Sequence, residues 1–77
     1  STYFIIMQRI SEGSTEAVVN SDFVENWYGI DVYVKEYANG DNITNYEFAI
    51  DSSFIDIVAD SEVDKEIIKQ TIKEAVF

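Results

Sequence analysis

The stretch IDVYVKEYANGDNITNYEFAI, residues 30–50, decides the fold that this sequence predicts. Two runs that alternate apolar and polar residues flank the segment ANGDN, and an Asn-Gly pair between such runs is a strong β-hairpin signal. A two-residue turn at Asn39 and Gly40 would mix apolar and polar residues on each face of the hairpin. Because a slip of one residue inverts the face of every side chain, we predict a loop with an odd number of residues.

That loop fixes which side chains of the hairpin share a face. It sets Ile30, Val32 and Val34 against one of two apolar sets, which differ by two residues in register. The sets are Phe48, Tyr46 and Thr44, or Ile50, Phe48 and Tyr46. The outward face then carries Tyr33, Lys35, Tyr37, Asn45 and Glu47.

Two further strands and a helix can be placed from their patterns. Residues 2–10 (TYFIIMQRI) are apolar on both alternating faces, which is typical of a central strand covered on both sides. Residues 54–59 (FIDIVA) predict a short strand. The last segment predicts a helix with Ser61 as its N-cap and Asp64 three residues later. Its apolar stripe is Val63, Ile67, Ile68, Thr71, Ile72, Ala75 and Val76.

The segment TEAVVNSDFVENWYG leaves two interpretations open. It is either one helix over residues 15–28, or a strand over 15–19 followed by a helix that begins at Ser21, so residues 15–20 are helix or strand. Gly29 fits a left-handed helix C-terminus in both cases. The fold class is therefore α+β: a mostly antiparallel sheet of four to five strands, with the C-terminal helix and an earlier helix packed on one face.

Composition limits the classes of function. At 77 residues the chain is a single small acidic domain, residues 1–77. It has no histidine and no cysteine, so the commonest general base, the strongest nucleophile and the soft metal ligands are missing. Its three glycines form no phosphate-binding loop. We expect a protein that is not an enzyme and uses no cofactor.

The net charge is the most unusual property of the sequence. Fifteen acids against five bases give a charge of −10, and residues 10–64 hold 13 acids and one base, a net of −12. Such a surface repels nucleic acid and anionic membranes, because phosphate binding depends on Lys and Arg. The apolar run at residues 3–7 is also far shorter than a membrane span. We expect a cytoplasmic protein, in the host cytoplasm if a phage encodes it.

Three short motifs have plain structural explanations. Asp60, Glu62 and Asp64 match the first ligand positions of a calcium loop, but Lys65 replaces its glycine and no carboxylate closes the site. Capping of the following helix therefore explains these acids better than metal binding. The sequon at residues 42–44 is most simply accidental. The lysines at 65, 69 and 73 form one helix edge, where solvated side chains would balance Glu62, Glu66 and Glu74.

The run DSSFIDIVADSEVD, residues 51–64, holds five carboxylates and no base. Carboxylates on one strand face or on successive helix turns are spaced closely enough to replace alternate phosphates of a nucleic acid. In size and composition, without any shared motif, the chain resembles small acidic inhibitors of DNA-processing enzymes. These are DNA mimics, anti-restriction and anti-CRISPR proteins, and the immunity proteins of nuclease toxins.

That resemblance implies an inhibitor that occupies the basic nucleic-acid-binding surface of a DNA- or RNA-processing enzyme. Acids would pair with Arg and Lys, and tyrosines would supply anchors that lose their water on binding. Trp27 is better explained as core than as an anchor. The candidate partner-binding residues are Glu36, Asp41, Glu47, Asp51, Asp56, Asp60, Glu62, Tyr33 and Tyr37.

Three other interpretations remain open. In the first, the acids form only a solvated surface. In the second, the protein is a structural or assembly module, such as a homodimer or larger homo-oligomer. It would use an exposed strand edge and the apolar faces of residues 3–10 or 54–59. In the third, it is a small enzyme or metal sensor, which predicts a melting temperature that depends on calcium or magnesium.

Overall fold

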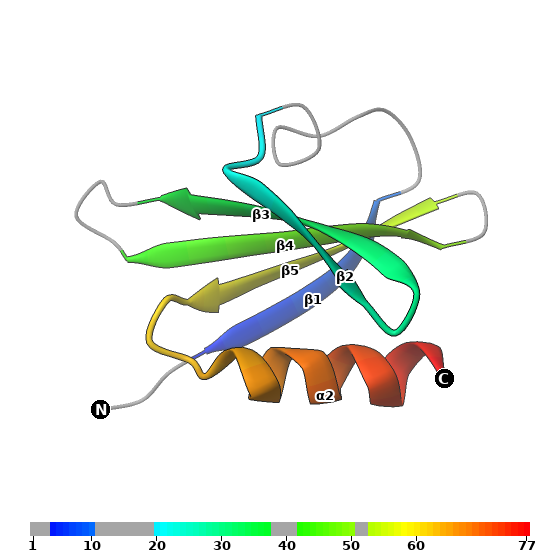
Figure 1. Ribbon diagram of the computed structural model, residues 1–77. Helices are drawn as coiled ribbons and strands as arrows, with labels where there is room; N and C mark the ends of the chain where they lie inside the picture. Colours follow the sequence, from blue (N-terminus) through cyan, green and yellow to red (C-terminus); the bar gives the residue numbers. More distant parts are fainter. Residues whose placement is uncertain (1–3, 11–19, 38–41, 51–52) are drawn as a thin grey trace.

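The computed structural model describes residues 4–10, 20–37, 42–50 and 53–77. These residues form one five-stranded antiparallel sheet, in the order β1-β5-β4-β3-β2, with a C-terminal helix along one face (Figure 1). The α+β class and the antiparallel sheet are confirmed. The elements are β1 (Ile5–Ile10), β2 (Phe23–Trp27), β3 (Ile30–Tyr37), β4 (Ile43–Ile50), β5 (Ser53–Asp60) and α2 (Lys65–Val76).

The central hairpin has the predicted odd loop. Val34 pairs with Tyr46 and Tyr37 pairs with Ile43, so five residues, 38–42, connect β3 to β4. This register belongs to the second of the two apolar sets and keeps the apolar side chains of both strands on one face. Asn39 and Gly40 lie outside the described residues.

The prediction of a helix up to residue 28 is wrong. Residues Phe23–Trp27 form strand β2, which pairs with β3, and the described residues contain no helix before α2. Tyr28 and Gly29 form the hairpin turn with φ values of 56° and 83°. A type I′ turn needs both values to be positive. The left-handed conformation expected of Gly29 is present, but it closes a hairpin instead of a helix. Residues 15–19 lie outside the described residues.

The prediction that residues 2–10 form a central strand is also wrong. β1 lies at one edge of the sheet and pairs only with β5 among the described strands. Phe4, just before this strand, and the apolar residues at the start of the strand are exposed: Phe4 by 40%, Ile5 by 37%, Ile6 by 53% and Met7 by 44%. Apolarity on both faces is equally consistent with a covered central strand and with an uncovered edge, so the pattern alone could not separate the two.

One hydrophobic core lies between the sheet and α2. Ile68 and Ile72 of the helix are fully buried, together with sheet residues such as Phe48 and Ile57. Trp27 is 4% exposed and belongs to this core, as predicted. In the predicted apolar stripe, however, Ile67 is 52% exposed. The helix therefore covers the sheet with a narrower face than the sequence suggested.

The helix begins later than predicted. Asp64 is the N-cap, and its Oδ1 accepts a hydrogen bond from the Glu66 backbone N–H at 2.9 Å. Ser61, the predicted cap, instead shares a hydrogen bond with Thr44, with 2.7 Å between the hydroxyl oxygens. The Val63 N–H donates to the Asp60 carbonyl at 3.0 Å, so residues 60–63 form a turn before the helix. Serine and aspartate are both good N-caps. Because the turn occupies residues 60–63, the helix starts after it and Asp64 is the cap.

Candidate functional site

The face of the sheet opposite α2, here called the distal face, carries a row of polar side chains across four strands. Tyr33 of β3 pairs with Glu47 of β4, Glu47 with Asp56 of β5, and Asp56 with Gln8 of β1. Because side chains alternate along a strand, these residues point away from the helix that covers Phe48 and Ile57. The row contains two carboxylates on adjacent strands.

Glu47 and Asp56 are buried, with 1% and 4% of their surfaces exposed. The sequence placed both among the carboxylates that meet a partner, and this is wrong because neither is accessible at the surface. The strand pattern predicted the outward direction of Glu47 correctly, since its side chain lies opposite the helix. The alternation of apolar and polar residues shows which way a side chain points, but not whether it is exposed. The pattern therefore could not predict that Glu47 and Asp56 are buried.

The two buried carboxyl groups act as a pair, here called the acid pair. The pKa of Glu47 is raised to about 7, first by burial and then by the negative charge of Asp56 and its hydrogen bond, against an opposing hydrogen bond from Asn45. Gln8 Nε2 donates to Asp56 Oδ2 at 3.0 Å. Asp56 Oδ1 is buried and accepts from no described donor group. A protonated Glu47 can supply that donor, so the acid pair is suited to holding one proton.

A group of exposed or half-buried carboxylates lies at a different place, the end of the sheet nearest the start of α2. Four residues make up this group, here called the acidic end: Glu36, Asp60, Glu62 and Asp64. Glu36, Glu62 and Asp64 are exposed and Asp60 is half-buried. Two of the acids also cap backbone groups, since Asp60 Oδ1 accepts from the Glu62 N–H and Asp64 from the Glu66 N–H, each at 2.9 Å.

Strand pairing brings the acidic end together from segments far apart in sequence. Tyr37 pairs with Ile43 and Ile43 with Asp60, so Tyr37 and Asp60 share one row of the distal face, two strand spacings or about 10 Å apart. Tyr33 and Tyr37 are both half-buried. Of the other predicted contact residues, Asp41 and Asp51 lie outside the described residues. The structure thus places Glu36, Asp60, Glu62 and Tyr37 at one end of the sheet.

The lysines are engaged within the molecule. Lys65 Nζ lies 2.7 Å from Glu25, Lys69 Nζ 3.5 Å from Glu66 and Lys35 Nζ 3.6 Å from Asp22. Each of the four lysines also lies over an aromatic ring, with the ammonium 5.3 to 5.9 Å from the ring centroid. Glu66 pairs with a lysine of the same helix, as expected. The shortest ion pair, however, joins Lys65 of α2 to Glu25 of β2.

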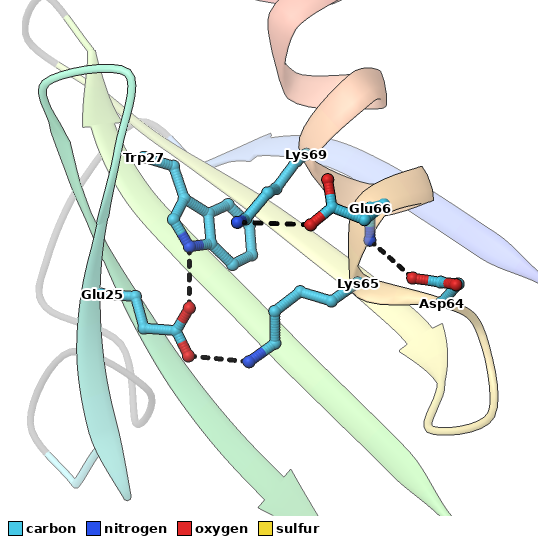
Figure 2. Close-up of polar contacts among 6 residues, drawn as sticks. All are labelled: Glu25, Trp27, Asp64, Lys65, Glu66 and Lys69. Carbon is cyan, nitrogen blue, oxygen red and sulfur yellow. Dashed lines mark hydrogen bonds and ion pairs between the residues drawn. The ribbon is translucent and has the colours of Figure 1, made fainter.

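That ion pair ties α2 to the edge strand β2, as Figure 2 shows. One carboxylate oxygen of Glu25 accepts from Lys65 at 2.7 Å, and the other accepts from Trp27 Nε1 at 2.9 Å. The hydrogen bond to Lys65 lowers the pKa of Glu25, and the same bond raises the pKa of Lys65. The sequence analysis missed this pair because it placed Glu25 in a helix. A strand over Phe23–Trp27 would have put Glu25 and Trp27 on one face.

The described residues hold neither a metal-binding cluster nor a membrane-spanning helix. They contain no group of three His, Cys, Asp or Glu side chains placed to hold a metal ion. Within the same ranges, no helix is long and apolar enough to cross a membrane. No known protein family matches the sequence, and no curated protein or solved structure matches it significantly.

Proposed function

We propose that this protein is a non-enzymatic binding protein that occupies the basic nucleic-acid-binding surface of an enzyme acting on DNA or RNA. The acidic end is the contact surface, with Glu36, Asp60 and Glu62 as the charged contacts and Tyr37 beside them. The observation that carries the proposal is this group of carboxylates, which strand pairing and the turn before α2 bring together. Lys35 and Lys65, which lie beside this group in the sequence, are already engaged within the molecule, with Asp22 and Glu25.

This arrangement favours steering of a basic partner over binding through a deep pocket. Carboxylates on a surface of net charge −10 attract Lys and Arg over several ångströms and speed the encounter. The acids at this end come from strand ends and a turn, and none of the described strands carries a continuous row of exposed acids. The acidic end would therefore bind a basic groove as a negative patch, and its carboxylates need not repeat the spacing of phosphates in a nucleic acid.

The first test is competition. Immobilised protein captures its partner from a lysate of the organism that carries the gene, and the captured enzyme is then bound to labelled duplex DNA. The expected result is that the protein displaces the DNA at one-to-one stoichiometry, with an affinity that weakens steeply as salt rises. Partners that are all acidic or uncharged, or an enzyme that binds DNA and the protein together, would contradict the proposal.

A matched pair of double variants locates the contact. Glu36→Gln with Glu62→Gln removes two carboxylates from the acidic end, and Asp31→Asn with Glu74→Gln removes two exposed carboxylates elsewhere. Both proteins have the same net charge. The first is expected to bind at least about tenfold more weakly, which corresponds to about 1.4 kcal/mol, and the second less than about twofold. Equal losses would show that only total charge matters.

A further inference from the structure

Among the residues that the structure describes, no strand pairs with the outer edge of β1, which leaves a place to add one. Natural sheets protect their edges with charges, prolines, bulges or covering elements. Apart from Arg9 and Gln8, the described part of this edge is apolar, from Phe4 through Met7 to Ile10. The opposite edge, β2, is shorter and is flanked by the Glu25–Lys65 pair. The two edges of the sheet are therefore not equivalent.

The backbone of β1 has hydrogen-bonding groups directed outward. The Phe4 carbonyl accepts from the Asp60 N–H at 3.2 Å, so Phe4 belongs to a pair that bonds toward β5. Antiparallel strands alternate between such pairs and pairs that do not bond to each other. The N–H and C=O groups of Ile5, Met7 and Arg9 therefore point away from β5, toward the open edge. Three residues in alternation can accept an added antiparallel strand.

The two ends of this edge carry opposite charge. At one end a hollow is lined by Ile5 together with Glu62 and Asp64 from the start of α2. At the other end a second hollow is lined by Met7 and Arg9 with Ala75 and Val76 of α2. Arg9 forms no ion pair with a described residue, and β1 itself contains no acid. The edge is thus basic at one end, acidic beside the other and apolar between them.

We propose that β1 pairs in antiparallel orientation with β1 of a second copy of this chain, joining two sheets about a two-fold axis. An antiparallel copy places its Arg9 beside the acidic hollow of the first, and the symmetry repeats this contact once. Each molecule has a net charge of −10, so two copies repel each other over most of their surfaces. β1 contains no acid, so two β1 strands can pair without bringing carboxylates together. This inference does not depend on the proposed function.

The outward backbone groups and the charges fix the register. With Met7 opposite Met7 of the second copy, Ile5 lies opposite the second copy's Arg9, and all three residues exchange backbone hydrogen bonds. The same side chains then share the face that carries α2 in both copies. Ile67, which is 52% exposed in the acidic hollow, would lose water at this contact. Apolar contact and paired charges act together, as in other strand-addition interfaces.

Single cysteines test the pairing and its register, because the natural chain has none. In Met7→Cys the two thiols meet across the axis, where Cα atoms of a bonded antiparallel pair are about 5.5 Å apart, within disulfide range. In Ile6→Cys, one position along, the two cysteines are diagonal neighbours about 7 to 8 Å apart, too far to bridge. Under mild oxidation we expect rapid covalent dimer from Met7→Cys and at least about tenfold slower dimer from Ile6→Cys.

Sedimentation of the unmodified protein supplies an independent readout. We expect a concentration-dependent monomer–dimer equilibrium that Met7→Lys abolishes, because it sets two ammonium groups against each other, and that Met7→Leu preserves. Arg9→Glu should weaken the dimer at least tenfold, whereas Arg9→Lys should not. A wild-type protein that stays monomeric at every concentration, or equal cross-linking of Met7→Cys and Ile6→Cys, would overturn the inference.

Discussion

Glu47 is a carboxylic acid in an environment that disfavours its ionised form. A carboxyl group that is 1% exposed beside Asp56 has a pKa of about 7, raised from 4.5 chiefly by burial. The folded protein therefore holds the Glu47 proton at pH values where the unfolded chain has released it. By proton linkage, its contribution to stability is complete below about pH 4.5 and is lost as pH rises through about 7.

Glu47→Gln should remove this pH dependence. The amide keeps the size of the side chain and can still donate to Asp56, but it cannot ionise. The variant should match the wild type near pH 4 and exceed its free energy of unfolding above pH 7, by an amount on the order of 3 kcal/mol at most. Urea denaturation across this pH range measures the difference.

The control for this experiment removes a carboxylate from the surface. Glu36→Gln alters an exposed residue of the neighbouring strand and should change the free energy of unfolding by less than about 0.5 kcal/mol at each pH. If Glu47→Gln is less stable than the wild type above pH 7, the ionised form of Glu47 has a stabilising partner and the acid pair does not share a proton as described.

At the scale of elements, the β2–β3 hairpin depends on a turn in which Tyr28 and Gly29 have positive φ values. Gly29 has a φ of 83°, and nothing lies within 4 Å of the position that a Cβ atom would take there. A substitution would therefore not create a clash, and its cost is that of the left-handed backbone alone. The turn also places Trp27 in the core, so its conformation affects both the strand pair and the packing.

Gly29→Ala should lower the free energy of unfolding by about 1 kcal/mol, because alanine resists a positive φ. Gly29→Asn should cost less, since asparagine adopts this conformation more readily. Urea denaturation of the three proteins at one pH gives the comparison. Equal stability of Gly29→Ala and the wild type would mean that residues 28 and 29 do not form the turn described.

At the scale of the whole molecule, like charges repel. Fifteen acids against five bases should make salt stabilising, although it weakens individual pairs such as Lys65–Glu25. The free energy of unfolding should rise as the Debye length falls from about 30 Å near 0.01 M salt to about 3 Å near 1 M. Denaturation in dilute protein, at several salt concentrations, measures the slope.

A variant with less charge isolates this effect from other actions of salt. Replacing Glu36 and Glu62 by lysine changes the net charge from −10 by two units at each position, to −6. The rise in stability with salt should then be smaller than in the wild type. The same slope in both proteins would indicate that repulsion between charges is not what salt relieves.

Patterns of period two and 3.6 predicted much of the fold. Residues 30–37, 43–50 and 54–59 alternate clearly, and each forms the expected strand. The odd β3–β4 loop follows because any other register would mix the faces. Residues 23–27 were assigned wrongly because a five-residue strand carries too few alternations to outweigh a competing helical pattern. The sequence predicted correctly that Glu47 points away from the helix, but it did not predict that this side chain is buried.

By itself, the sequence determined the α+β class, the odd length of the central hairpin loop, the C-terminal helix and the excess of acid, because these depend on local spacing and composition. Tertiary structure alone decided that β1 lies at an edge, that Glu47 and Asp56 are buried together and that Lys65 meets Glu25. The physical reason is that strand order and burial arise from contacts between distant segments. Alternation along one strand is the same whether or not another element covers it.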